Sequence, residues 1–199
     1  MCGIAGYVGS CVIPIERLNI CLDQLYLRGP DDYGIYENTN GNLNVGLLHR
    51  RLSILDLDPR SAQPFHFRHL VFSFNGEIYN YLELRAELEA LGHRFHTSGD
   101  TEVMAIAWFE WGKAALNRFD GMWALAVFDT LTSTLTISTD PFGEKPLYYM
   151  RGTDGNIYFA SQIDCVLTLA NQKARPNWQH LKRYLVNGYK SLYKTQIAL

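Results

Sequence analysis

The second residue, Cys2, carries the side chain best suited to covalent chemistry in this chain. An initiator methionine before a residue as small as cysteine is usually removed, so we expect Cys2 to become the first residue of the mature protein. Its thiol would then lie beside a free α-amine, whose ordinary pKa of about 7.7–8.0 leaves roughly a tenth to a fifth unprotonated at pH 7. The thiol, with an ordinary pKa of about 8.5, needs a base, and the amine can act as one directly or through a water. The sequence therefore predicts an N-terminal cysteine nucleophile.

Cysteine and histidine also have less reactive explanations here. Taken alone, Cys2 is also compatible with a small apolar residue that begins a buried strand. The other three cysteines form no CxxC pair, which excludes zinc-ribbon and thioredoxin-type motifs, and a chain with this much apolar material needs no disulfide framework. Two close histidine pairs have no third ligand type clustered with them, so we expect no metal site.

Six short motifs follow one another in order along the chain: CGIAG at 2–6, RGPDD at 28–32, LHRRLSI at 48–54, FNGEIYN at 74–80, GDTEV at 99–103 and DPFGEKPLYY at 140–149. Together they resemble the glutaminase domain of class II glutamine amidotransferases, in the branch of the glutamine-hydrolysing asparagine synthetases. The resemblance covers nearly the whole chain, and six ordered motifs are far more specific than any single one.

The resemblance implies an N-terminal-nucleophile hydrolase that acts on the side-chain amide of L-glutamine. Cys2 would attack this amide, form a glutamyl thioester and release ammonia, and water would then release glutamate. By the family pattern, the Asn75 side-chain amide and the Gly76 backbone N–H would stabilise the negative oxygen of the tetrahedral intermediate. From the residues alone, Asn75-Gly76 also predicts a tight turn at the end of a strand.

Free glutamine is a zwitterion, and the resemblance assigns a residue to each of its charges. Arg51 matches the family's carboxylate clamp, since a guanidinium can bind a carboxylate with two parallel hydrogen bonds. Asp100 matches the ammonium acceptor, although an aspartate there is also typical of an ordinary helix N-cap. Leu52, Ile54 and Glu77 align with residues that line the family's pocket, partly through backbone contacts.

Other charged or polar residues of the motifs are expected to be structural. Arg28 and Asp31 predict a buried ion pair that fixes the loop at the Gly-Pro turn between them. His49 and Arg50 are expected to belong to the scaffold. Lys145 is interpreted as a solvated charge.

We predict one glutaminase domain over residues 1–199, in which residues from about 176 lead toward a C-terminal synthetase domain that this sequence lacks. A full asparagine synthetase has a Ser-Gly-Gly-x-Asp-Ser phosphate loop, and this sequence contains neither that loop nor a Walker motif. No cofactor is therefore expected for the glutaminase domain, and ATP and Mg are implied only for the missing one. The expected partners are L-glutamine and the synthetase domain, and a homodimer is a further candidate assembly.

Two departures from the family pattern leave the acceptor of the ammonia open. Thr139 stands where arginine is usual, and residues 161–164 read SQID in place of the usual Ser-Glu-x-Lys. The acceptor could thus be aspartate, a sugar acid or a peptide carboxylate. Two further alternatives are a catalytically silent regulatory or binding domain of the same fold and an acylase or peptidase that acts on another amide. The opposite charges of Arg51 and Asp100 favour a free amino acid as substrate.

The elements that must position these residues alternate between strand and helix periodicity. Strands are predicted at 3–8, 34–37, 43–48, 69–74, 123–128, 135–138, 147–150 and 157–160, and helices at 14–27, 80–91, from about 100, 162–169 and 178–185. Asn40-Gly41 predicts a hairpin turn, and Asn80 is expected to cap its helix with Glu83. Hairpins grouped apart from helices favour an α+β fold with mainly antiparallel sheets. The resemblance specifies a four-layer αββα sandwich.

Composition excludes several other classes of protein. With 47% hydrophobic residues, 19% charged residues and a net charge of −2, the chain is neither disordered nor a basic nucleic-acid-binding module. No apolar stretch reaches the length of about 20 residues that a membrane-spanning helix needs. The first basic residue is Arg17, so a secretory signal is not expected, and we expect a cytoplasmic location.

Overall fold

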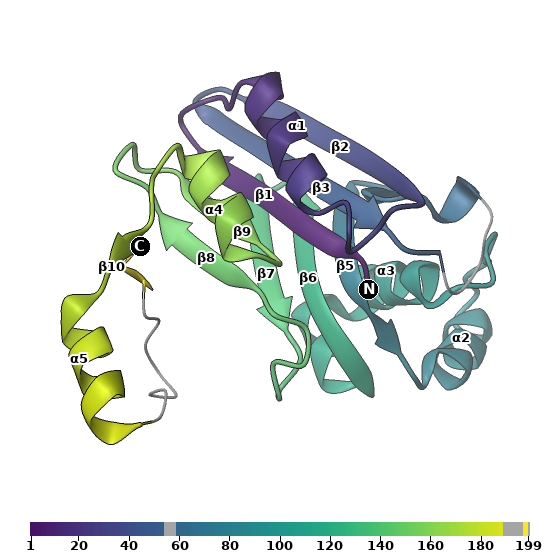
Figure 1. Cartoon of the computed structure of the whole chain (residues 1–199). Helices are drawn as coiled ribbons and strands as arrows, with labels where there is room; N and C mark the ends of the chain where they lie inside the picture. The colour runs from purple at the N-terminus through teal and green to yellow at the C-terminus, as the bar shows by residue number, and fades with distance from the viewer. Residues whose placement is uncertain (54–58, 189–196, 199) are drawn as a thin grey trace.

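The computed structural model describes residues 1–53, 59–188 and 197–198, and its centre is a pair of antiparallel sheets (Figure 1). The first sheet has the strand order β2-β3-β1-β9-β8, with β1 (Gly3–Gly9), β2 (Asp32–Asn40), β3 (Leu43–Arg51), β8 (Tyr148–Arg151) and β9 (Ile157–Ala160). The second has the order β4-β5-β6-β7, with β4 (Phe65–Phe67), β5 (Leu70–Ile78), β6 (Gly121–Asp129) and β7 (Thr134–Thr139).

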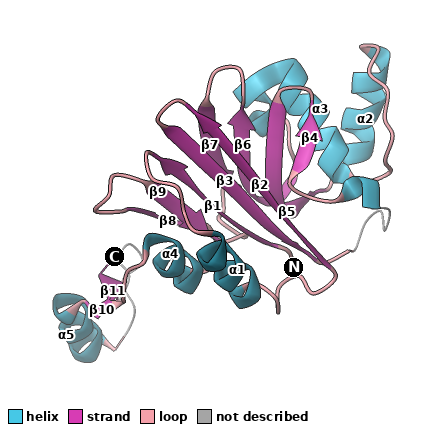
Figure 2. Cartoon of the chain, turned by 90° about the horizontal axis from the view of Figure 1, so that it is seen from above, coloured by secondary structure: helices cyan, strands magenta, loops and turns pink. Residues whose placement is uncertain are grey.

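Helices cover the outer face of each sheet, as Figure 2 shows from above. On the first sheet lie α1 (Ile15–Gln24) and α4 (Ile163–Ala170), which share a buried cluster with strands β1 and β3. On the second lie α2 (Tyr81–Ala90) and α3 (Asp100–Trp111), followed by the 3₁₀ helix η2 (Gly112–Asn117). Another 3₁₀ helix, η1 (Pro59–Ser61), precedes β4.

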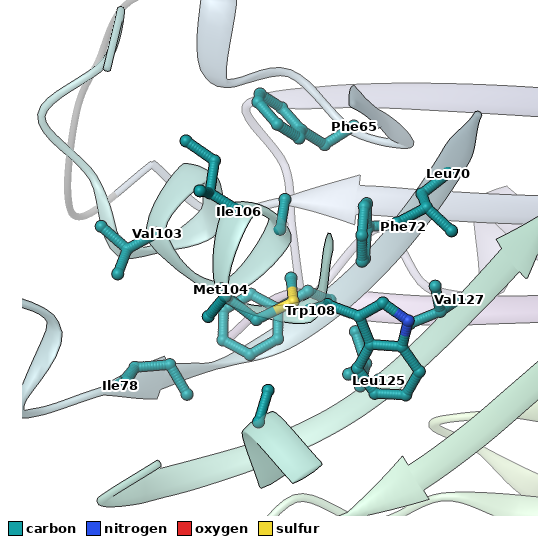
Figure 3. Packing of buried hydrophobic residues seen from close by; sticks show 14 of the residues in the cluster. Phe65, Leu70, Phe72, Ile78, Val103, Met104, Ile106, Trp108, Leu125 and Val127 are labelled. Atoms are coloured by element: carbon teal, nitrogen blue, oxygen red, sulfur yellow. The ribbon is translucent and has the colours of Figure 1, made fainter. Parts of the chain in front are cut away.

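Three apolar clusters hold these four layers together. The largest joins α3 to β5 and β6, and Figure 3 shows Met104 and Trp108 of α3 beside Phe72 and Leu125 of the strands. A second lies under α1 and α4, and a third lies between the two sheets. Burial of this much apolar surface is the main favourable contribution to folding. The predicted α+β class and the αββα sandwich are confirmed.

The C-terminal part, α5 (Trp178–Asn187) with the short strands β10 (Arg175–Pro176) and β11 (Ile197–Ala198), lies beside the sandwich and not within it (Figures 1 and 2). That residues from about 176 lead toward a second domain stays a prediction, and part of this segment lies outside the described residues. Among the residues that the structure describes, no helix combines the length and the apolarity needed to cross a membrane.

Two local predictions about the second sheet are wrong. Asn75-Gly76 does not end a strand, because β5 continues to Ile78 and pairs Gly76 with Trp123 of β6. A Cβ at Gly76 would collide with the Met122 carbonyl oxygen, so glycine permits close backbone approach here and not a turn. The hairpin at Asn40 is confirmed, with Asn40 paired to Leu43.

Asn80 does not cap α2 with its side chain. Its Nδ2 donates to the Arg118 carbonyl at 2.9 Å, and its Oδ1 accepts from the Asp120 N–H at 2.9 Å. The side chain therefore joins the start of α2 to the loop before β6, because that loop offers backbone groups that no strand partner satisfies. The local sequence pattern cannot predict these contacts, because Arg118 and Asp120 are far from Asn80 in the sequence.

Candidate active site

One pocket brings together every described residue that the sequence predicts for the site: Cys2, Arg51, Leu52, Asn75, Gly76, Glu77 and Asp100. These residues come from the start of β1, the end of β3, the end of β5 and the first turn of α3. The register of β1 with β3 pairs Gly3 with Arg50, which places Cys2 near the end of β3. The remaining predicted residue, Ile54, lies outside the described residues.

The backbone around Cys2 is held on both sides. Its thiol donates to the Leu52 carbonyl at 3.6 Å, and the Leu52 N–H donates to the sulfur at 3.4 Å. Arg28 Nε donates to the Cys2 carbonyl at 3.0 Å. Arg28 is thus a residue of the site that sequence reasoning missed, although it stands in one of the six motifs.

The predicted ion pair between Arg28 and Asp31 is wrong. Asp31 is exposed, and its Oδ2 accepts from the Ser53 N–H at 2.7 Å. Arg28 turns instead toward the half-buried start of β1, where the carbonyl of Cys2 needs a donor. The two charged residues therefore fix two different backbone segments at the pocket.

The thiol of Cys2 is not activated by its surroundings alone. Burial raises the pKa of the Cys2 thiol, and the hydrogen bond with Leu52, the positive N-terminus and Arg51 only partly oppose this effect. A raised pKa means that the sulfur is protonated at neutral pH. Nucleophilic chemistry at this position therefore requires a nearby base.

Asn75 presents an unused hydrogen-bond donor to the pocket. The residue is 1% exposed, and its Nδ2 is buried with no partner among the described residues. Buried donors in folded proteins are nearly always paired, so an unpaired one that lines a pocket is available to a ligand.

The backbone N–H of Gly76 points to the same side of β5 as the N–H groups of Phe74 and Ile78, which are already hydrogen-bonded. The Phe74 N–H donates to Gln63 Oε1 at 2.6 Å, and the Ile78 N–H donates to Asp100 Oδ2 at 3.0 Å. Because N–H directions alternate along a strand, the N–H of Gly76 points between these two contacts, away from β6. Trp123, opposite Gly76, uses its own N–H and carbonyl for Asp140. The Gly76 N–H is therefore a second donor directed at the pocket.

His49 braces the strand that carries these donors. Its Nε2 donates to the Phe74 carbonyl at 3.1 Å from a fully buried position. Burial lowers the pKa of His49 to about 3, so the ring is neutral at physiological pH. His49 thus has the structural role that the sequence predicts.

Asp100 lies in the first turn of α3 but does not cap it, because Gly99 is the N-cap residue. Its carboxylate accepts from the Ile78 N–H and is buried in the pocket wall. Burial raises the pKa of Asp100 to about 6, with a further rise from the negative charge of Glu77. The pocket therefore holds a buried carboxylate and the buried guanidinium of Arg51, which suits a ligand with both charges.

Several further residues line the pocket without having been predicted, among them Ser61, Gln63 and Lys145. Lys145 is only 6% exposed, so its interpretation as a solvated charge is wrong. The loop before it wraps around Asp140, whose carboxylate accepts from the N–H groups of Phe142, Glu144 and Lys145 itself. This wrapping buries Lys145, and only its place in the last of the six motifs could have indicated it.

Comparison with known proteins agrees with this geometry. A family model described as "Glutamine amidotransferase domain" matches residues 1–198. The chain is 34% identical to the putative asparagine synthetase [glutamine-hydrolyzing] 2 of Methanocaldococcus jannaschii, over 100% of this chain. It is 39% identical to asparagine synthetase [glutamine-hydrolyzing] 1 of Bacillus subtilis, over 86% of this chain. It spans only 42% and 27% of the lengths of these two relatives.

A solved structure with the same fold is the glutamine phosphoribosylpyrophosphate amidotransferase from B. subtilis, in complex with ADP and GMP. It superposes with a TM-score of 0.68 and 23% identity, over 85% of this chain and 43% of that one. The family model covers nearly the whole chain, and the two relatives are 34% and 39% identical to it over most of its length. The chain is thus a member of the glutamine amidotransferase domain family, as its six motifs predict.

Proposed function

We propose that this domain hydrolyses the side-chain amide of L-glutamine through Cys2, giving glutamate and ammonia. The observation that carries the proposal is the pair of donors in the pocket of the thiol. The Asn75 Nδ2 has no partner among the described residues, and the Gly76 N–H points to the same side as two occupied neighbours. Two converging donors are what the negative oxygen of a tetrahedral intermediate requires.

The charges of the pocket support glutamine over an uncharged amide. Arg51 would bind the α-carboxylate, and Asp100 would accept from the α-ammonium. Leu52 and Glu77 line the same pocket and would bound the substrate between these charges. An acylase or peptidase substrate lacks this pair of charges, so it would not be recognised by both the guanidinium of Arg51 and the carboxylate of Asp100.

The proposed reaction uses the α-amine that removal of Met1 would expose on Cys2. The amine takes the thiol proton as the sulfur attacks the amide carbon, and the oxygen that becomes negative is held by Asn75 and Gly76. The amine then gives the proton to the leaving nitrogen, which departs as ammonia. Water attacks the resulting thioester, and glutamate leaves as the thiol is restored.

We further propose that the ammonia is passed to an ATP-dependent domain of the asparagine synthetase type. The relatives named asparagine synthetase are more than twice as long as the part that this chain matches. ATP and Mg would bind in that further domain, which would transfer the ammonia to a carboxylate such as aspartate.

A glutaminase assay with Cys2→Ala tests the proposal. The Met-trimmed chain, verified by intact mass, is expected to release glutamate from glutamine, and Cys2→Ala to release none while its melting temperature stays nearly unchanged. Cys11→Ala is a matched control, because Cys11 is exposed and does not line the pocket. Glutamate release by Cys2→Ala, or loss of activity in Cys11→Ala alone, would overturn the assignment of the nucleophile.

A further inference from the structure

Lys145 is a buried cation that has no anionic partner in the part of the chain that the structure describes. It is 6% exposed, and it forms no ion pair with any carboxylate of the described residues. Its Nζ donates to the Met1 sulfur at 3.2 Å, and a thioether is only a weak acceptor. Burial of an ammonium group without a compensating charge is costly, so a position that retains one calls for a function.

The backbone of Lys145 is fixed, which holds the base of its side chain at the pocket. The carboxylate of Asp140 accepts from the N–H groups of Trp123, Phe142, Glu144 and Lys145. Burial raises the pKa of Asp140, but these backbone N–H groups outweigh it and lower the pKa overall, so the anchor stays charged at neutral pH. The side chain of Lys145 then reaches the wall that Cys2 also lines.

The contact with Met1 places the ammonium next to the future N-terminus. Met1 is the residue bonded to the Cys2 nitrogen, and its loss converts that peptide nitrogen into an α-amine. The cation that contacts Met1 in the structure would then lie near the new amine in the pocket that both line, where the protein walls reduce the screening by water. A nearby positive charge disfavours protonation of an amine.

We propose that Lys145 is a positioning residue that keeps the α-amine of mature Cys2 in its unprotonated form, ready to take the thiol proton. This inference rests on the proposed glutaminase function and adds to it the origin of the base. Because Lys145 acts on the amine and not on glutamine, its effect depends on pH and is absent once the amine is fully unprotonated.

The other charged groups around the amine do not replace Lys145. Glu77 of β5 and Asp100 of α3 line the pocket as carboxylates, and they favour the ammonium form. Arg51 of β3 also lines the pocket, but the α-carboxylate of glutamine neutralises it in the proposed complex. Arg28, after α1, is directed at the Cys2 carbonyl. The guanidinium of Arg28 also acts on the amine from the carbonyl side of Cys2, and Lys145 adds a further positive charge that offsets the two carboxylates.

The decisive measurement is the pH profile of kcat/KM for glutamate release between about pH 5.5 and 9.5, with Met-trimmed proteins. Lys145→Met is expected to raise the apparent pKa of the acid limb by about half a unit to one unit, because the amine regains its proton more easily. Below pH 7, kcat/KM of Lys145→Met is then expected to be roughly three- to tenfold lower than that of the parent protein. Near pH 9 the two values are expected to be equal. Lys145→Arg, which keeps the charge, is expected to restore the parent profile. Lys113→Met, at an exposed lysine of η2, is the matched control.

A second readout is independent of turnover. In a Cys2→Ala background the α-amine is retained, and its titration can be followed by NMR after reductive methylation with ¹³C-formaldehyde. Lys145→Met and Lys145→Gln are both expected to raise the pKa of this amine relative to the background protein. Thermal melts of Lys145→Met and Lys145→Gln check that each variant is folded, and the titration is read from the folded ones.

Three outcomes would overturn the inference. They are an unchanged amine titration, a loss of activity that is equal at every pH, and a rise in KM alone, which would mean that Lys145 binds the substrate carboxylate. If the parent chain releases no glutamate, the proposed function fails, but the NMR titration still decides whether Lys145 acts on the amine.

Discussion

At the scale of single residues, the Asn75 Nδ2 has no hydrogen-bond partner among the described residues, so its loss should affect catalysis more than stability. Asn75→Ala is expected to lower kcat about 10²- to 10³-fold, the cost of about 2.7–4 kcal/mol seen when one such donor is removed. The melting temperature is expected to change little, because Nδ2 gives up no hydrogen bond to the described protein. Steady-state kinetics and a thermal melt check both. A variant that melts early but keeps its kcat would mean that Asn75 is a structural residue.

Asp100 gives the site a pH dependence of its own. Its pKa is raised to about 6 by burial, so the carboxylate gains a proton as the pH falls through that value. If Asp100 holds the α-ammonium of glutamine, binding is expected to weaken progressively below about pH 6. Calorimetric titration of glutamine into Cys2→Ala between about pH 4.5 and 8 measures this, without interference from turnover.

The matched variant for this experiment is Asp100→Asn. Its affinity is expected to be low at every pH and to lack the transition near pH 6, since no charge remains to titrate. A transition that persists in Asp100→Asn would show that a group other than Asp100 causes it. The amide keeps the acceptor for the Ile78 N–H, so the start of α3 stays anchored.

At the scale of elements, His49 links the two sheets through one neutral ring. The ring lies on β3 and donates to the Phe74 carbonyl on β5. Its pKa is about 3 in the folded state and about 6.5 in an unfolded chain, so the unfolded state binds the proton more readily between these values. The free energy of unfolding that His49 contributes is therefore complete above about pH 6.5 and is lost as the pH falls toward 3.

His49→Gln tests this coupling. The variant can still donate to Phe74 but cannot titrate, so its free energy of unfolding is expected to depend less on pH between about 6.5 and 4 than that of the parent. Urea denaturation at a series of pH values provides the measurement. Asp100 contributes with the opposite sign, because its folded pKa is raised, and the comparison between parent and variant removes that common contribution. Equal slopes in the two proteins would show that His49 does not titrate on unfolding.

The sequence predicts the elements better than the contacts between them. Hydrophobic periodicity correctly predicts most of the strands and helices, because the periodicity reflects which face of each element is buried. The three-residue strand β4 is too short to give a periodic signal. The prediction of a turn at Asn75-Gly76 is wrong because pairing with β6 outweighs the local preference of this dipeptide for a turn.

The polar partners could not be predicted for a related reason. A buried charge or amide bonds to whichever backbone group the tertiary packing leaves unsatisfied, and that group can be far away in the sequence. Arg28 thus contacts the Cys2 carbonyl and not Asp31, and Lys145 contacts Met1 from a buried position. The predicted residues of the pocket were found through the six motifs, and their geometry became known only through the fold.

At the scale of the whole molecule, the sandwich explains why such distant segments meet. Cys2, Arg51 and Asn75 lie on or beside strands of two different sheets, and Asp100 lies on a helix that covers the second. The pocket is lined by these strand ends together with the first turn of α3. All the groups that the proposed hydrolysis requires thus belong to this one domain, and none of them is a nucleotide-binding group.

This arrangement predicts that glutamine hydrolysis by the 199-residue chain is independent of ATP. Ammonia and glutamate are expected to appear in equal amounts, since thioester hydrolysis releases one glutamate for each ammonia formed. Addition of ATP and Mg is expected to leave the rate unchanged, because the described pocket has no part in nucleotide chemistry under the proposed mechanism. A coupled assay for each product, with Cys2→Ala as the blank, makes the comparison. A rate that rises with ATP, or ammonia without matching glutamate, would mean that hydrolysis depends on groups beyond this pocket.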